Sequence, residues 1–388
     1  MQPANLSELI IEIEKCGFDK WLLLALTKAF TAARKGKLGT YDEHSFELHW
    51  MQNLVYLRDS ILERTYEPSA SVAFVIFDPM VREIFAAPFR DRIVHHFLYE
   101  MQAGWWDRRF IKNSYSCREG KGTLYGIKQA QRMMWRVTQN GTKKAYIVKL
   151  DIKGYFMHLQ RQKLYDRVKW GLDRQFADVM SNEYGRKLYY LCDFLWQQVL
   201  FDDPIKKTWR RGPLANWNAN ILPPEKSLYC QPPEQGIVIG NLTSQLVSNI
   251  FLDLLDRFVT VELGYKWYGR YVDDFFIMVP KEDLARLKGD VVKIEVFLRE
   301  KLGLVLHPKK RYCQSVYKGM SFLGARIYPC CLYPSDRLQK NFLVAAYDVT
   351  HGFREIESIV SYLGLMKHLN SQDFNFRVFE KVGWRYRM

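Results

Sequence analysis

The stretch from Tyr265 to Val279 places two short aromatic and aliphatic runs on either side of Asp273-Asp274. Tyr, Val, Phe and Ile favour β-strands, and a short polar break between two such runs predicts a β-hairpin. Adjacent carboxylates repel one another unless a cation lies between or beside them. The segment is therefore a candidate Mg²⁺ site carried on a hairpin. The simpler alternative is a solvated turn, because Asp is a common turn residue.

Length, composition and charge restrict the classes of protein to consider. The chain has 388 residues, of which 48% are hydrophobic, and this is enough for two or more subdomains around a sizeable core. Its net charge of +15 indicates a polyanionic partner, nucleic acid before membrane. The seven cysteines lack Cys-x-x-Cys spacing, which argues against a zinc site and a disulfide framework. We expect a cytoplasmic protein without membrane association, because neither a signal segment nor an apolar run approaching ~18 residues is visible.

The N-terminal third combines helices with two short strands. Apolar residues at helical spacing predict three helices, the third over about residues 43–64. Strands are expected at 72–77 and 82–86, separated by the turn signal Asp78-Pro79. A further helix is expected over about 89–101.

Two irregular segments differ in what they suggest. Residues 114–123 form a small, glycine-broken loop with Arg118 and Lys121, which suits contact with a phosphate backbone. The loop lacks the Gly-x-x-x-x-Gly-Lys-Ser/Thr spacing of a nucleotide-binding P-loop. Residues 201–233 are rich in Pro and Trp and are expected to be a long loop or small insertion, to which the sequence assigns no role.

The rest of the chain alternates strand and helix signals, and an apolar strand at 146–150 ends at Asp151. Other expected elements are helices at about 161–171, 182–200, 246–258 and 281–301, a small hairpin from 304–306 and 311–314, a strand at 320–327, and helices over 335–388.

Three carboxylates, those of Asp151, Asp273 and Asp274, each fall at the end of an apolar strand signal. Two-metal phosphoryl transfer needs carboxylates on adjacent rigid strands, where they hold Mg²⁺ ions that activate a hydroxyl and neutralise a triphosphate. Mg²⁺ suits such a site because it prefers oxygen ligands and completes its shell with substrate phosphates.

Several motifs occur together in the order found in one enzyme family. They are Tyr271-Val272-Asp273-Asp274, the segments Asp151–Phe156 and Arg82–Arg92, Lys310, and Phe322-Leu323-Gly324. The first resembles the Y-x-D-D box of reverse transcriptases, and the others resemble their first catalytic-aspartate box, fingers strand, palm lysine and primer-grip strand. The resemblance covers about residues 70–330.

This resemblance implies an α+β fold of the right-hand polymerase type, with fingers, palm and thumb and an antiparallel palm sheet. The implied domains are a helical N-terminal extension (1–66), fingers (67–145), palm (146–334, with the 201–233 insertion) and a short helical thumb (335–388). The implied activity is RNA-directed DNA polymerisation with two Mg²⁺ ions.

The family also implies roles for single residues. The catalytic metal ligands would be Asp151, Asp273 and Asp274, together with the backbone of Ile152. Contacts to the dNTP would come from Arg82, Ile152, Lys153, Gly154, Tyr155, Phe156, Ile239, Gly240, Gln245 and Lys310. Contacts to RNA or primer would come from Arg92, Arg118, Lys121, Phe322, Leu323 and Gly324.

Two of these residues have specific implied functions. Arg82 would clamp the triphosphate bidentately, and the alternative for it is a strand-edge salt bridge. Phe156 would be the steric gate that excludes a ribose 2′-hydroxyl, and the alternative for it is core packing. Many relatives carry a fingers lysine six residues before the arginine, but that position is Ile76 here, so clamping would depend on Arg82 alone.

The segment Ile239–Gln245 resembles one subfamily. Most reverse transcriptases have Ser-Pro where this chain has Ser244-Gln245. The Ser-Gln form resembles the enzymes of diversity-generating retroelements, in which it is associated with adenine-specific misincorporation while a template-repeat RNA is copied. Proline would rigidify this position, whereas glutamine adds amide donors and acceptors, so we expect Gln245→Pro or enlargement of Ile239 to alter errors opposite adenine.

The resemblance implies partners and leaves alternatives open. Relatives act with a structured template-repeat RNA that also primes synthesis, with the cDNA product, and with a small basic oligomeric accessory protein, in mutagenic retrohoming. The first alternative is a defence-associated or retron-like reverse transcriptase. The second is a catalytically silent RNA-binding scaffold, which three uncompensated carboxylates disfavour. No maturase, HNH-like or integrase region is recognisable, which disfavours a mobile intron protein.

Overall fold

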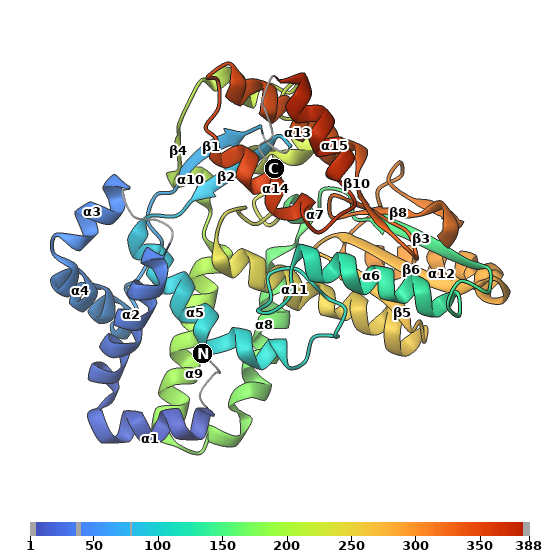
Figure 1. Cartoon of the computed structure of the whole chain (residues 1–388). Coiled ribbons are helices and arrows are strands. Elements are labelled where there is room, and N and C mark those ends of the chain that lie inside the picture. Colours follow the sequence, from blue (N-terminus) through green and yellow to red (C-terminus); the bar gives the residue numbers. More distant parts are fainter. Residues whose placement is uncertain (1–4, 36–39, 78–79, 383–388) are drawn as a thin grey trace. The chain divides into compact units, whose positions relative to one another are not determined.

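The computed structural model describes residues 5–35, 40–77 and 80–382. The turn predicted at Asp78-Pro79 lies outside these residues, as do the extreme ends of the predicted first and last domains. The chain forms two compact units, each built from several segments. The first comprises Met1–Phe110, Gly154–Leu254 and Arg299–Leu304, and the second comprises Ile111–Lys153, Leu255–Leu298 and Val305–Met388. Figure 1 traces the elements along the chain.

The first unit is mostly helical. Its helices are α1 (Leu6–Cys16), α2 (Phe18–Arg34), α3 (Tyr41–Glu47), α4 (Trp50–Leu62), α5 (Phe89–Asp107), α7 (Tyr155–His158), α8 (Arg161–Phe176), α9 (Glu183–Phe201) and α10 (Pro204–Lys207). Its strands are β1 (Val72–Ile76), β2 (Arg82–Ala86) and β4 (Trp209–Arg210), in the order β2-β1-β4. The helix α11 (Leu242–Arg257) contributes residues to both units.

The second unit is built on an antiparallel sheet with the strand order β5-β6-β3-β7. These strands are β3 (Ala145–Asp151), β5 (Trp267–Tyr271), β6 (Asp274–Pro280) and β7 (Tyr312–Ser315). A second sheet, β10-β9-β8, contains β8 (Met320–Phe322), β9 (Ala325–Ile327) and β10 (Leu332–Pro334). The helices are α6 (Thr123–Val137), α12 (Leu284–Phe297), α13 (Asp336–Thr350), α14 (Glu357–Met366) and α15 (Gln372–Lys381).

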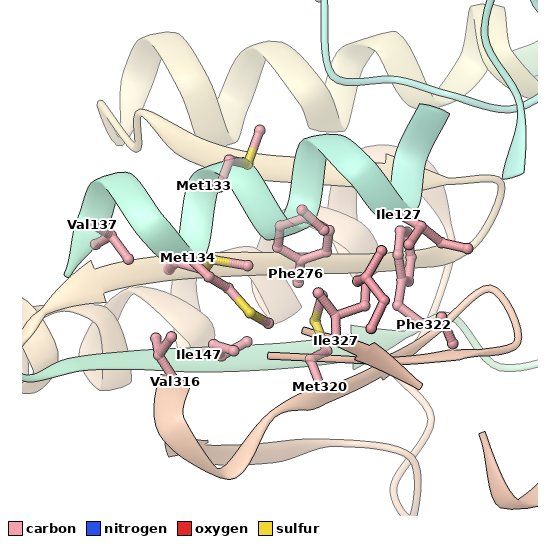
Figure 2. Close-up of a cluster of buried hydrophobic side chains, with 14 of the residues drawn as sticks. Ile127, Met133, Met134, Val137, Ile147, Phe276, Val316, Met320, Phe322 and Ile327 are labelled. Atoms are coloured by element: carbon pink, nitrogen blue, oxygen red, sulfur yellow. The ribbon is translucent and has the colours of Figure 1, made fainter. Parts of the chain in front are cut away.

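One hydrophobic core in the second unit joins α6 to both sheets. Figure 2 shows Met134 and Val137 of α6 beside Ile147 of β3 and Phe276 of β6. The ring of Phe322, from β8, meets that of Phe276 edge-on at a centroid distance of 5.2 Å. Ile147 and Phe276 lie on the same face of the sheet as Asp151 and Asp274, and this core holds the strands in place, because close-packed interiors resist displacement.

Three predicted elements differ from the structure. The helix expected over 43–64 is divided into α3 and α4, and the break at Leu48–His49 lets Phe46 pack 5.4 Å from the Phe89 ring. The strand expected at 320–327 is instead a tight β8–β9 hairpin. Its turn residues Leu323 and Gly324 both have positive φ, as a two-residue hairpin turn requires.

The small hairpin expected from 304–306 and 311–314 is also wrong. β7 pairs with β3 along four residues, whereas residue Leu306 makes only an isolated bridge with Ile152. The reason is that the open edge of β3 offers a row of backbone groups that need partners. The helix α6 was not predicted, although Ile127, Ala130 and Met134 follow helical spacing.

The mixed α+β class with an antiparallel sheet is confirmed. The assignment of segments to fingers, palm and thumb, and the predicted domain boundaries, remain predictions. In the described part of the chain, no helix combines the length and apolarity needed to cross a membrane.

Candidate active site

The predicted hairpin brings the three carboxylates to one end of the main sheet. β5 and β6 pair antiparallel with Tyr271 opposite Asp274, which leaves Val272 and Asp273 as the turn. Across the next strand pair, Asp151 lies opposite Asp274. Opposed residues on antiparallel strands share one face, with Cβ atoms about 4.5–5.5 Å apart. The carbonyl oxygen of Asp273 accepts a hydrogen bond from the Ile152 amide at 3.2 Å, which ties the turn to β3.

Two lysines neutralise two of these carboxylates. Lys149 Nζ lies 2.8 Å from Asp274 Oδ2, and Lys310 Nζ lies 3.2 Å from Asp151 Oδ1 and 3.3 Å from Oδ2. Lys149 precedes Asp151 by two residues on β3, so both side chains stand on the same face. The premise of three uncompensated carboxylates is therefore wrong for Asp151 and Asp274.

The two lysines nevertheless leave part of the negative charge of the three carboxylates unpaired. Asp274 Oδ1 is enclosed and has no hydrogen-bond partner among the described residues. Burial raises the pKa of the Asp273 carboxyl to about 6, and repulsion from Asp151 adds to the rise. Burial also raises the pKa of Asp274, although Lys149 opposes the shift. An added cation would relieve both effects, because it stabilises the ionised carboxylates.

The three carboxylates have the chemistry of Mg²⁺ ligands, but their present arrangement does not form a metal site. Carboxylate oxygens, one of them an enclosed and unpartnered oxygen of Asp274, are the ligands that Mg²⁺ prefers. Within the described ranges, however, no three His, Cys, Asp or Glu side chains form a group that could hold a metal as arranged. In this arrangement Lys149 contacts Asp274 and Lys310 contacts Asp151.

The hairpin turn is strained and held by hydrogen bonds. Val272 has φ 54°, in the left-handed region that β-branched residues rarely adopt. Its N–H donates to Ser116 Oγ at 3.2 Å, and its carbonyl accepts from Arg270 Nη1 at 3.0 Å. The position of Asp273 thus depends on residues outside the segment Tyr271–Asp274.

Arg270 is held in turn by a buried carboxylate. Its Nε and Nη2 donate to the two oxygens of Asp256 at 2.6 and 2.7 Å, and Tyr268 donates to the same carboxylate at 2.7 Å. Both Arg270 and Asp256 are fully buried. This bidentate pair fixes β5 directly beside the turn.

The loop predicted to bind a phosphate backbone supports the hairpin instead of standing free. Ser114 Oγ accepts from Arg270 Nη2 at 3.1 Å, and Ser114 and Ser116 are buried. Arg118 donates to the carbonyls of Ile111 and Ser114, at 2.7 and 3.1 Å, and Lys121 donates to that of Lys112 at 2.8 Å. The RNA contacts predicted for Arg118 and Lys121 remain predictions.

The predicted primer-grip residues lie in the same unit. Phe322 is buried in the core, where the Lys149 ammonium group lies 5.9 Å from its ring centroid. Leu323 and Gly324 form the β8–β9 turn. The Phe322 ring is enclosed, and the primer contacts expected for these three residues remain predictions.

The backbone predicted to contact a triphosphate is already hydrogen-bonded near Asp151. The Ile152 amide donates to Asp273 as described, and the Lys153 amide donates to the carbonyl of Val305 at 2.9 Å. The carbonyl of Asp151 accepts from the His307 amide at 2.7 Å.

The first unit holds further residues predicted to bind the dNTP, among them Arg82 and Tyr155, and also Arg92, predicted to contact RNA or primer. Arg82 is exposed on β2 and makes no ion pair or hydrogen bond with a described residue, so the alternative of a strand-edge salt bridge is not seen. Arg92 Nε donates to the carbonyl of Ala87 at 2.8 Å. Tyr155 is buried and donates to the carbonyl of Ser248 at 2.7 Å.

The predicted base pocket and steric gate share one hydrophobic cluster. Phe156 and Ile239 are half-buried against a cluster that includes Phe85. Gly240 has φ 130°, and a Cβ there would come within 2.8 Å of the Phe85 carbonyl, so this close approach requires glycine. Gln245 is exposed. The packing of Phe156 is compatible with both a gate and a core role.

Sequence reasoning missed several residues that organise these sites. Lys149 could have been found from strand alternation, because it shares a face with Asp151. Arg270 and Asp256 carried no local signal, since their pairing depends on the way the hairpin packs on the end of α11. The same holds for Ser116 and for Glu83, described below.

No protein-family model matches the chain, and no curated protein matches it. Among solved structures, the chain is similar to telomerase from Candida albicans in complex with a TWJ fragment of telomeric RNA. The identity is 10% and the TM-score 0.45, over 86% of this chain and 59% of the other. Telomerase from Candida tropicalis, in complex with the same kind of fragment, gives 12% identity and a TM-score of 0.47 over 81% and 55%.

The apo telomerase from Candida tropicalis gives 13% identity and a TM-score of 0.44 over 81% and 58% of the two chains. This chain thus spans between 55% and 59% of these telomerase chains. At TM-scores below 0.5, the similarity decides nothing about function, which has to be argued from the residues of the site.

Proposed function

We propose that the chain is a reverse transcriptase, an RNA-directed DNA polymerase. The observation that supports this most is the register that sets Asp151 opposite Asp274 with Asp273 in the adjoining turn. Phosphoryl transfer requires little covalent chemistry from a protein, and it does require carboxylates fixed on rigid strands. The Arg270–Asp256 pair and the core of Figure 2 supply that rigidity.

Asp151, Asp273 and Asp274 would hold two Mg²⁺ ions, with the Ile152 carbonyl as a further ligand. Bound there, the ions would lower the pKa of an attacking 3′-hydroxyl and neutralise developing charge on the phosphates. The chain's own residues would bind and select the nucleotide. Arg82 would hold the triphosphate and Phe156 would exclude a ribose 2′-hydroxyl, so that the substrate is a dNTP.

We propose further that the enzyme belongs to a diversity-generating retroelement. The support is Ser244-Gln245 in place of Ser-Pro, with the Gln245 side chain exposed at the start of α11. In this proposal the enzyme copies a template-repeat RNA with errors opposite adenine, for mutagenic retrohoming. A defence-associated or retron-like enzyme would instead copy adenine accurately.

The net charge of +15 supports an RNA partner, whose phosphates the basic residues would neutralise. Such binding should weaken steeply with salt because counterions are released on association. A structured RNA that carries the template and primer, and a small basic oligomeric protein, are the partners proposed.

A catalytically silent RNA-binding scaffold is the second candidate. The specific observation in its favour is the pair of lysine contacts, which neutralise Asp151 and Asp274 without any metal. A scaffold would keep these ion pairs in the presence of Mg²⁺, whereas a polymerase would exchange them.

The deciding experiment is primer extension on an adenine-containing RNA template with Mg²⁺, dNTPs and product sequencing, with Asp273→Asn as the control. We expect cDNA from the native chain and a loss of at least about 10³-fold in the variant. Errors concentrated opposite adenine would support the retroelement assignment, and accurate copying would exclude it. If no cDNA forms even with the RNA and protein partners added, the scaffold is favoured.

Cation binding can be measured independently of polymerase activity. Mn²⁺ can replace Mg²⁺ as a paramagnetic probe, and its binding should be weaker in Asp273→Asn. Unchanged Mn²⁺ binding would argue against metal ligation by this residue.

A further inference from the structure

Residues 201–233, here called the strap, contribute the short strand β4 to the sheet that carries Arg82. β4 adds in parallel to β1, with Val72 opposite Trp209 and Ala73 opposite Arg210. The Trp209 amide donates to the Ser71 carbonyl at 3.0 Å, and the amide that follows β4, at Arg211, donates to that of Ala73 at 2.7 Å. The expected loop therefore has a fixed edge within the first unit.

Glu83, the neighbour of Arg82 on β2, anchors the strap. Its side chain is fully buried and accepts three hydrogen bonds, each from a strap residue. Trp217 Nε1 and Ser227 Oγ donate to Oε1 at 2.8 and 3.0 Å, and the Leu228 amide donates to Oε2 at 2.6 Å. Burial raises the pKa of Glu83, and the hydrogen bonds oppose the rise. A buried carboxylate satisfied in this way holds its strand firmly, because losing a partner leaves polar groups unpaired.

The strap also shares a hydrophobic cluster with two other predicted nucleotide-binding residues of the first unit, Phe156 and Ile239. Trp217 and Tyr229 join the hydrophobic cluster that contains Phe156 and Ile239. The carbonyl of Ile239 accepts a hydrogen bond from the Phe85 amide, on β2, at 3.0 Å. One cluster therefore connects the strap, β2, the predicted steric gate and the predicted base pocket.

We propose that the strap positions the nucleotide-binding residues, with Glu83 as the positioning residue that locks β2. Arg82 and Glu83 are consecutive on a strand and face opposite sides, so Glu83 fixes the strand without touching the nucleotide. Arg82 has no ion pair or hydrogen bond with a described residue, so the position of its Cα and Cβ depends on the strand. The inference rests on the proposed polymerase function, in which the ligand is the triphosphate of a dNTP.

The test is the kinetics of Glu83→Gln, measured as KM for dNTP and kcat on a saturating primed template. The side-chain amide of glutamine places an N–H donor where Glu83 accepts hydrogen bonds from strap donors. At least one of these hydrogen bonds is lost, so β2 is held less firmly against the strap. We expect KM to rise about tenfold while kcat changes by less than about twofold, because misplacing a binding group by about 1 Å has large effects. Trp217→Phe, which removes one donor, should raise KM less, by about threefold.

Asp193→Asn is the matched control in the same unit. Asp193 is also buried and accepts hydrogen bonds from Tyr165 Oη at 2.8 Å and Gln197 Nε2 at 3.2 Å, and Lys169 Nζ lies 3.1 Å from its Oδ2. All of these residues belong to α8 and α9. The Asp193→Asn substitution should lower the free energy of unfolding without changing the KM for dNTP. Equal KM values in Glu83→Gln and Asp193→Asn would overturn the proposal.

Hydrogen exchange tests the anchor independently of polymerisation. In Glu83→Gln the amides of Leu228 and Arg211 should exchange faster than in the native chain, and in Asp193→Asn they should not. Unchanged exchange in Glu83→Gln would overturn the anchor whether or not the protein polymerises. Absence of cDNA from the native chain with its partners, by contrast, overturns the proposed function.

Discussion

Two aspartate–cation pairs of the second unit, Asp256 with Arg270 and Asp151 with Lys310, differ in their access to water. Asp256 and Arg270 are both fully buried and share two hydrogen bonds. Asp151 is paired instead with Lys310, whose side chain remains 56% exposed. An ion that cannot return to water is a fixed part of the fold, whereas an exposed lysine can be exchanged for another cation. An aspartate–cation pair therefore stabilises the fold at Asp256–Arg270, whereas at Asp151–Lys310 the lysine can be replaced by another cation.

The largest effect should come from breaking the buried pair. Asp256→Ala leaves the Arg270 guanidinium buried without its carboxylate, and we expect the free energy of unfolding to fall by about 3–5 kcal/mol. Denaturant titration measures this change.

Asp290→Ala is the matched comparison. Asp290 is also buried and also accepts a hydrogen bond from a tyrosine hydroxyl, that of Tyr265 at 2.7 Å, but its cationic partners Lys293 and Arg286 are 67% and 55% exposed. Both cations can be solvated again, so we expect a smaller loss, about 1–2 kcal/mol. Equal losses in the two variants would show that access to water does not separate the two kinds of pair.

A smaller effect should come from adding Mg²⁺, the cation that Asp151, Asp273 and Asp274 are proposed to bind. Mg²⁺ at about 100 times its Kd should stabilise the native chain by about 2.7 kcal/mol. Asp274→Asn should lose this increment because it removes an anionic ligand, and urea unfolding with and without Mg²⁺ measures it. Asp336→Asn, at an exposed carboxylate of the same unit, should retain it. Retention in both variants would place the bound cation elsewhere.

The smallest effect should come from removing the exposed lysine. Lys310→Met should change the free energy of unfolding by less than about 1 kcal/mol, as Lys293→Met should. It should also lower the Mg²⁺ concentration needed for half of the stabilisation, because Lys310 no longer competes for Asp151. A higher Mg²⁺ requirement in Lys310→Met would mean that this lysine supports cation binding.

Local patterns were sufficient for the hairpin and for most helices. The strand-forming runs around Asp273-Asp274 and the alternation of β2 depend on neighbours in sequence, and the structure confirms these strands. The hairpin partner predicted for residues 311–314 and the single strand predicted over 320–327 were wrong. The pairing of β7 with β3 depends on which strand edge is left open after the chain has folded, and the β8–β9 hairpin depends on the left-handed turn at Leu323-Gly324.

The sequence alone determined which residues carry the candidate chemistry, because motifs and strand periodicity are local properties. It placed Asp151, Asp273 and Asp274 at strand ends, and the register brings them together. Only the tertiary structure decided what surrounds them. Arg270 meets Asp256, and Glu83 meets the strap residue Leu228 145 positions away, through packing between distant segments. Such contacts leave no trace in local patterns, because burial and hydrogen-bond partners are set only when the whole unit is assembled.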